Sequence, residues 1–139
     1  FTDAGLSYFF EMVYLITSGS ATYLYPLNLL VRSKFILAYS KGKGMPRIGG
    51  VQNWYEGRQD KLWHAWGQDV DHARYYVDYF SPVDGIVLDC FFGGGTTAVA
   101  CELLGRRWLG FDIDKNALFT SKIRLSKAGV PHQQQMSFV

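Results

Sequence analysis

The sequence is poor in the features that mark secreted or membrane-spanning proteins. It has two cysteines in 139 residues, so a disulfide framework is excluded and a reduced, cytoplasmic compartment is the simple interpretation. No run approaches the ~18 apolar residues of a membrane span, and no secretory signal is evident. The formal net charge of +2 is nearly neutral, so charge alone does not indicate a nucleic-acid binder.

Apolar residues are plentiful by contrast. They make up 48% of the chain, and aromatic residues make up 17%. A chain of this length and composition buries a sizeable core without being split. We therefore expect a single domain over residues 1–139.

The most informative segment is residues 86–114, IVLDCFFGGGTTAVACELLGRRWLGFDID. Glycine tolerates positive φ and a close ligand, and it often follows the last residue of a helix. The segment therefore predicts a strand at 86–88 that stops at Asp89, a turn at 93–95, a helix at 96–104 closed by Gly105, and a strand at 108–111 that stops at Asp112.

The two strand-end acids indicate the kind of cofactor. Asp112 lies 19 residues after Gly93, close to the roughly 20 residues that separate the glycines of the dinucleotide fingerprint from its ribose-binding acid. The loop is not G-x-G-x-x-G, however, and Asp89 would repel a pyrophosphate. S-adenosylmethionine has a ribose, a cationic amine and no phosphate, so it suits both acids.

Residues 89–97, DCFFGGGTT, resemble the D-P-F-x-G-x-G-T-T signature of DNA methyltransferases that methylate the exocyclic amine of adenine (N6) or cytosine (N4). Cys90 stands where that family usually has proline. The segments GFDID, GRRW, HAWGQ and FILAYSKG are similar to further family elements, so the resemblance covers most of residues 31–125. It implies an α/β fold, a three-layer αβα sandwich of the Rossmann-like methyltransferase type, here incomplete.

The resemblance implies S-adenosylmethionine as cofactor and double-stranded DNA as partner. Asp89 would bind the methionine ammonium, Asp112 the ribose hydroxyls, and Thr96 the methionine carboxylate. One phenylalanine of the motif should enter the core while the other lies near the adenine. The full predicted cofactor set is Asp89, Phe91, Phe92, Gly93, Gly95, Thr96, Thr97, Asp112, His64 and Gln68.

Structural alternatives stay open for these positions. Asp89 would otherwise cap its loop, Asp112 would be a surface turn acid, and Thr96 a plain helix cap. Asp114 is expected to be the N-cap of the following helix. The pair His64 and His72 lacks a third ligand at sensible spacing, so no metal site is predicted.

The family's catalytic tetrad, [DNS]-P-P-[YFW], is absent, because none of the four prolines adjoins another. We expect a C-terminal part of a longer prokaryotic or phage-type protein, with the tetrad before Phe1 and no catalytic residue or activity in this chain alone. The missing strand would leave an open sheet edge that favours self-association. Alternatives are a non-catalytic remnant that binds S-adenosylmethionine or DNA, a methyltransferase of RNA or small molecules, and, distantly, an NAD oxidoreductase.

The remaining segments carry weaker patterns. A helix is predicted at 4–15, a strand at 34–40, helices at 70–80 and 116–126, and a fraying tail at 129–139, whereas 21–30 is unassigned. Residues 41–62 read as a glycine-rich basic loop, either simply solvated or a target-recognition region that contacts phosphates and stacks on bases. Its candidate DNA-binding residues are Lys41, Lys43, Arg47, Trp54 and Arg58.

Overall fold

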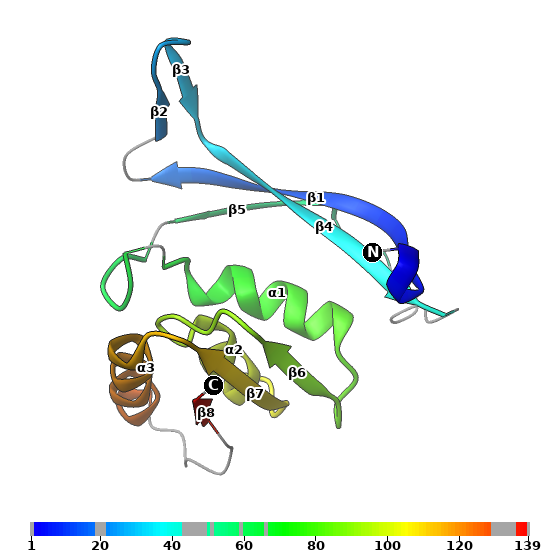
Figure 1. The fold of residues 1–139 in the computed structure, drawn as a ribbon, viewed down its shortest axis with the longest axis vertical. Helices are drawn as coiled ribbons and strands as arrows, with labels where there is room; N and C mark the ends of the chain where they lie inside the picture. The colour runs from blue at the N-terminus through cyan, green and yellow to red at the C-terminus, as the bar shows by residue number, and fades with distance from the viewer. Residues whose placement is uncertain are drawn as a thin grey trace. The chain divides into compact units, whose positions relative to one another are not determined.

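The computed structural model describes residues 2–18, 22–42, 50, 52–58, 60–65, 67–128 and 136–138. The chain divides into two compact units, Phe1–Arg58 and Gln59–Val139. Each unit has its own sheet (Figure 1). The single domain expected from length stays a prediction.

The unit Phe1–Arg58 is mostly β-structure. After a 3-10 helix, η1 (Thr2–Ala4), it contains β1 (Leu6–Ser18), β2 (Thr22–Leu24), β3 (Leu29–Val31), β4 (Ser33–Lys41) and β5 (Trp54–Arg58). The main sheet has the order β4-β1-β5, with β4 antiparallel and β5 parallel to β1, while β2 and β3 form an antiparallel hairpin. The strand predicted at 34–40 is confirmed as β4.

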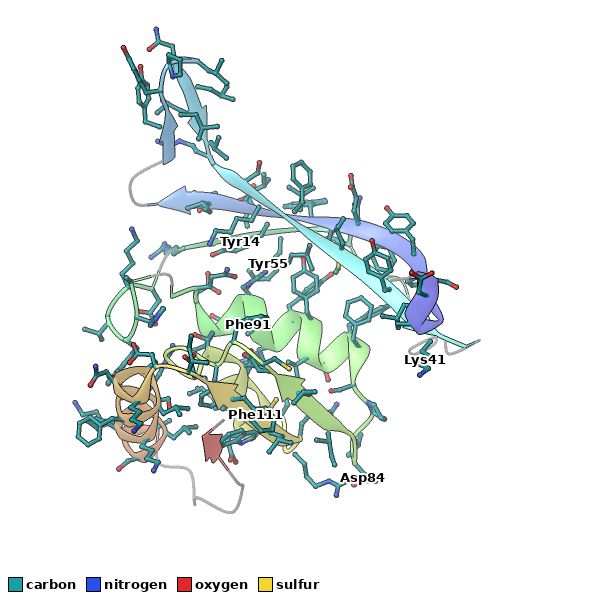
Figure 2. The ribbon with its side chains drawn as sticks, viewed as in Figure 1. Tyr14, Lys41, Tyr55, Asp84, Phe91 and Phe111 are labelled. Carbon is teal, nitrogen blue, oxygen red and sulfur yellow. The ribbon has the colours of Figure 1, made fainter. Side chains whose placement is uncertain are left out.

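The helix predicted at 4–15 is wrong, because this segment is the long strand β1. Its buried side chains alternate, with Met12, Tyr14 and Ile16 at 3, 1 and 7% exposure, which is the period of a strand rather than a helix. The apolar spacing matched a helix, but aromatic and β-branched residues fit a pleated sheet better. Tyr14 also stacks on Tyr55 of β5 (Figure 2), with 6.4 Å between the ring centroids.

Two segments expected to lack structure also contain strands. Within the predicted 41–62 loop, β5 pairs in parallel with β1 from Val13↔Trp54 to Ser18↔Arg58. Within the predicted fraying tail, β8 (Met136–Phe138) pairs with the strand that ends at Asp112. Both pairings join residues far apart in sequence, which local composition does not encode.

The unit Gln59–Val139 has the α/β order predicted from the sequence. It contains α1 (Val70–Phe80), β6 (Ile86–Asp89), α2 (Thr96–Leu103), β7 (Arg107–Asp112), α3 (Lys115–Lys127) and β8. The sheet order is β6-β7-β8, and both pairings are parallel (Figure 1). None of the helices in the described part of the chain has the length and hydropathy of a membrane span.

Local sequence explains where these helices begin and end. The Asp69 carboxylate accepts from the His72 N–H at 2.6 Å and so caps α1. Asp114 caps α3 as predicted, accepting from the Asn116 N–H at 2.8 Å. Gly105 has φ +63° just after α2, the left-handed conformation that closes many helices.

One core joins all three helices to the same sheet. It includes Val77 of α1, Val99 of α2 and Leu118 of α3, packed with Phe92 and Trp108. Phe92 stacks on Trp108 at 5.3 Å. On β6, by contrast, Ile86 and Leu88 are exposed, at 61 and 57%.

Candidate functional site

A pocket of about 570 Å³ lies within the unit Gln59–Val139. Its walls come from the segment before α1, from α1, from the loop between β6 and α2, and from the end of β7. Its volume falls in the ~300–1,000 Å³ range of small-molecule and cofactor sites. The lining residues are His64, Gly67, Gln68, His72, Ala73, Tyr76, Val77, Asp89, Phe91, Phe92, Gly93, Gly94, Thr96, Thr97 and Asp112.

The structure brings nine of the ten predicted cofactor residues to this pocket. The exception is Gly95, the N-cap of α2, with φ +71°. A Cβ there would stand 2.9 Å from the Ser121 Cβ. Gly95 thus allows α3 to approach the start of α2 rather than lining the pocket.

Asp112 accepts two backbone hydrogen bonds, one of them from the glycine loop. One carboxylate oxygen accepts from the Gly93 N–H at 2.6 Å, and the other accepts from the Asp114 N–H at 2.8 Å. The first bond joins residues 19 positions apart, so the spacing found in the sequence corresponds to a direct contact between loop and strand end. Asp112 is therefore tied into the pocket wall, not merely a surface turn acid.

Asp89 ends β6 beside the end of β7, because β6 and β7 are parallel neighbours. Its carboxylate accepts from the Phe91 N–H at 3.0 Å, which is the loop-capping contact considered as the alternative role. Asp89 also lines the pocket, so the loop-capping contact does not remove its carboxylate from the pocket wall. Parallel strands present their carboxyl ends at one sheet edge, where α/β proteins bind ligands.

The prediction that one phenylalanine of the motif enters the core is confirmed. Phe92 is 3% exposed and enters the core, whereas Phe91, which is labelled in Figure 2, is 91% exposed. Close packing around Phe92 requires glycine at position 110, since a Cβ there would lie 2.2 Å from the Phe92 ring. Phe91 is therefore the member of the pair that remains accessible at the pocket.

Thr96 begins α2, and its hydroxyl is engaged within the protein. Its Oγ1 accepts from Arg124 Nη1 at 2.9 Å and is 3.4 Å from the Gln68 carbonyl oxygen, to which it donates. The hydroxyl thus links α3 to the segment before α1.

Sequence reasoning missed one wall of the pocket, the face of α1 formed by His72, Ala73, Tyr76 and Val77. The sequence predicts the helix at 70–80, but helical spacing alone does not indicate which of its faces lines a pocket. His72 is 7% exposed and meets the Tyr76 ring edge-on at 5.1 Å. Gly67 and Gly94 also line the pocket and were not singled out.

The thiol of Cys101, in α2, is buried and protonated at neutral pH. Burial raises the pKa of Cys101 to about 12, with further increases from the charges of Glu102 and Asp89. A neutral thiol is a poor nucleophile. Among the described residues, no group of three or more His, Cys, Asp or Glu side chains is arranged to hold a metal ion.

The predicted DNA-binding residues are distributed along the other unit. Lys41 pairs with Leu6 at one end of β1, whereas Arg58 pairs with Ser18 at the opposite end. The 13 residues of β1, from Leu6 to Ser18, span roughly 40 Å in an extended strand. Trp54 is 44% exposed at the start of β5, and Lys43 and Arg47 lie outside the described residues. Lys41 and Arg58 therefore do not belong to one compact patch.

The fold and pocket together define a nucleotide-cofactor type of α/β protein, in which a glycine loop lies between two strand-end acids. A family model described as DNA methylase matches residues 47–122, more than half of the chain. The chain belongs to the DNA methylase family.

Individual relatives agree with this assignment. Type II methyltransferase M1.MboII of Moraxella bovis is 36% identical over 58 residues, which are 42% of this chain and 22% of that protein. The M1.HpyAVI–SAM complex matches with a TM-score of 0.72 and 20% identity, covering 89% of this chain and 65% of that one. A putative DNA modification methylase of Thermus thermophilus, TTHA0409, complexed with S-adenosyl-L-methionine, has a TM-score of 0.73 and 19% identity, covering 99% and 60%.

A fourth similar protein is the PvuII DNA methyltransferase, described as cytosine-N4-specific, with a TM-score of 0.66 and 13% identity over 90% of this chain and 52% of that one. At such low identities the solved structures show the shared fold, which confirms the Rossmann-like architecture. The chain spans 22% of M1.MboII and between 52 and 65% of these structures.

Proposed function

We propose that the pocket binds S-adenosyl-L-methionine and that the chain is the cofactor-binding part of a DNA amino-methyltransferase. One observation carries the proposal. The carboxylates of two adjacent parallel strands, Asp89 and Asp112, line the same pocket with the glycine loop between them. A sulfonium cofactor with an ammonium and a ribose has a cationic group for one acid and a diol for the other.

The hydrogen bonds of Asp112 suit a ribose. A carboxylate offers about four acceptor sites on its two oxygens. The Gly93 and Asp114 N–H groups each use one site, on different oxygens. One acceptor site per oxygen remains, which matches the two neighbouring hydroxyl donors of a ribose.

The second acid of the pocket suits a cation. Asp89 uses one acceptor site on the Phe91 N–H, which leaves the rest for an ammonium group, and charge-assisted bonds of this kind are the stronger class. The exposed Phe91 ring offers a surface on which an adenine stacks. When bound, S-adenosyl-L-methionine supplies an electrophilic methyl group, and the residues of this chain bind and orient it.

The substrate we propose is the exocyclic amine of adenine (N6) or cytosine (N4) in double-stranded DNA, as in a restriction–modification system. The base would be turned out of the duplex into a pocket. The amine loses its proton after it gains the methyl group, so no general base is needed beforehand. The tetrad that would hold the amine is absent from this sequence, and we expect the 139-residue chain to bind cofactor without turnover.

The absent tetrad also favours a second candidate, a module that binds S-adenosyl-L-methionine or DNA without catalysis. The two candidates differ in one measurement. Adding a polypeptide that carries the [DNS]-P-P-[YFW] strand should restore methyl transfer to DNA if the chain is part of an enzyme. No transfer in the presence of tight cofactor binding would support the non-catalytic module.

Calorimetric titration with S-adenosyl-L-methionine tests the cofactor assignment. Asp112→Asn and Asp89→Asn should each weaken binding by about tenfold or more, since a hydrogen bond to a charged group contributes ~1.5–3 kcal/mol. Asp84→Asn is the matched control, because Asp84 is an exposed acid in the turn before β6 and does not line the pocket. Equal affinities for all three variants and the unaltered chain would contradict the assignment.

We also propose that two copies of the chain associate through β6. Among the described strands β6 is an edge strand, and Ile86 and Leu88 on it are exposed. Parallel sheets are normally covered on both faces, and open edges tend to pair. Sedimentation should show a dimer that Ile86→Lys converts to monomer, with Val83→Lys in the preceding turn as control. A monomeric unaltered chain would overturn this proposal.

A further inference from the structure

Arg124 lies outside the pocket lining but contacts three of the segments that form or support the pocket. It is a residue of α3 and is 5% exposed. Its Nη1 donates to the Gly94 carbonyl at 3.0 Å and to Thr96 Oγ1 at 2.9 Å, and its Nη2 donates to Asp60 Oδ2 at 3.0 Å. One guanidinium therefore joins the glycine loop, the start of α2 and the segment before α1.

The segment before α1, residues 60–65 and 67–68, is called here the pre-helix segment. It supplies His64, Gly67 and Gln68 to the pocket, yet its described residues form neither a helix nor a strand longer than a single bridge. Because its backbone bonds are limited to a turn from Gly67 to His64 and the bridge at Gln68, contacts with side chains of other elements contribute to its position. Those contacts come largely from α3 and α2.

Among the contacts of the described residues, three join the pre-helix segment to α2 and α3. The Asp60 carboxylate pairs with Arg124, the Trp63 ring lies 5.9 Å from the Arg124 guanidinium and 5.4 Å from Lys127 Nζ, and the Gln68 carbonyl accepts from Thr96. Arg124 takes part in the first two directly and in the third through Thr96. Removing it would weaken all three together.

The glycine loop meets this segment closely. A Cβ on Gly94 would lie 3.1 Å from both the His64 Cβ and the Trp63 Cβ. The planar guanidinium fork matches its three acceptors, whereas a lysine ammonium at this position has no such geometry. Burial lowers the pKa of Arg124, and the Asp60 charge opposes that shift, as expected for a cation held between protein groups.

We propose that Arg124 is a positioning residue for the cofactor pocket, which fixes the pre-helix segment against the glycine loop and so sets the affinity for S-adenosyl-L-methionine without touching it. The affinity part rests on the proposed function. The positional part does not, because it concerns the placement of residues 60–65 in the protein alone.

A purely stabilising role is the competing explanation, and Arg106 provides a matched control. Arg106 is also 5% exposed and donates to Asp78 at 3.1 Å, to Ser81 Oγ at 3.3 Å and to the Leu104 carbonyl at 2.8 Å. None of these three partners lines the pocket. Arg106→Lys therefore removes a comparable buried fork whose acceptors lie at the end of α1 and after α2, and not on the pre-helix segment or the glycine loop.

The test compares Arg124→Lys with Arg106→Lys in the 139-residue chain. Three quantities are measured: stability in urea, hydrogen exchange of residues 60–65 without cofactor, and calorimetric affinity for S-adenosyl-L-methionine. Arg124→Lys should speed exchange in residues 60–65 and weaken binding by about tenfold, within the ~5–150-fold range typical of coupling between sites. Arg106→Lys should leave both quantities unchanged at a similar loss of stability.

Each outcome decides the proposal. Equal changes in affinity and exchange for the two variants would overturn it, and so would unchanged exchange in Arg124→Lys. If the unaltered chain does not bind the cofactor but Arg124→Lys speeds exchange, the cofactor assignment fails and the positioning role stands. Should Arg124→Lys not fold, Asp60→Asn, which removes the same ion pair from the 29% exposed side, should show the same two effects more weakly.

Discussion

The two units of this chain bury different kinds of residue. Gln59–Val139 encloses a core drawn from three helices and a sheet, and every buried polar or charged side chain identified among the described residues belongs to it: His72, Ser81, Arg106, Ser121 and Arg124. In Phe1–Arg58, the described large apolar side chains that are buried are Met12, Tyr14 and Ile16, all on β1. The hairpin β2–β3 instead exposes Tyr23, Leu24, Leu29 and Leu30.

This difference shows that the units are stabilised in different ways. In Gln59–Val139, buried cations attach loops to a packed core, so that loop geometry and core packing are linked. In Phe1–Arg58, the strands are held mainly by the β1 pairings and by one buried stripe of side chains. Substitutions of the same chemical type should therefore have unequal effects in the two units.

The largest expected contrast is between two leucines. Leu118 is fully buried in the core, whereas Leu30 is 59% exposed on β3. Leu118→Ala should lower the free energy of unfolding by about 2–5 kcal/mol because it leaves a cavity, and Leu30→Ala should change it by less than about 0.5 kcal/mol. Urea unfolding measures both. An equally large loss for Leu30→Ala would mean that another surface covers the hairpin in solution.

A smaller effect tests the bond between β1 and β5. The Tyr14 hydroxyl donates to the Arg58 carbonyl at 2.7 Å. Tyr14→Phe should cost about 1 kcal/mol, the usual net contribution of one hydrogen bond. Tyr25→Phe, at an 84% exposed position, is the matched control and should have almost no effect. If the two variants were alike in urea unfolding, the hydroxyl bond would not contribute to the stability of this sheet.

The smallest expected effect on stability concerns Cys101, and it appears only at alkaline pH. Its pKa rises from 9.0 to about 12 on folding, so the unfolded thiol loses its proton first and stability falls as pH rises from 9 towards 12. Below the pKa of the unfolded state the thiol is neutral in both states, so its contribution to folding stability is fully present.

Urea midpoints measured at about pH 8 and about pH 10.5, on either side of the unfolded pKa, check this prediction. Cys101→Ala should lose less stability between the two pH values than the unaltered chain. Cys90→Ala, which removes the exposed thiol, is the matched control. Identical pH dependence in all three proteins would contradict a buried, neutral Cys101.

Much of Gln59–Val139 was predictable because its determinants are local. Asp69 and Asp114 cap their helices, Gly105 ends α2, and the strand–glycine–helix order from Ile86 to Asp112 appears directly in the sequence. The 19-residue spacing of Gly93 and Asp112 is also visible in the sequence, although the hydrogen bond between them was not predicted. These features depend on residues within one or two elements of each other.

The remainder depends on partners that a single sequence does not connect. The apolar spacing of β1 satisfied a helical template as well, and only its pairing with β4 and β5 decides for a strand. Arg124 escaped notice because its acceptors lie 28 to 64 residues away. The α1 wall of the pocket was visible as a helix, but the face that lines the cavity is set by tertiary packing.

The bonds of Asp112 have a thermodynamic consequence. Fixing one residue of backbone costs roughly 1–2 kcal/mol of conformational entropy. Because the Asp112 carboxylate already holds the loop at Gly93 at 2.6 Å, a ligand arriving at this pocket would not have to order that loop itself. The ordering of this loop is therefore a cost of folding and not of binding, and preorganisation of this kind favours affinity.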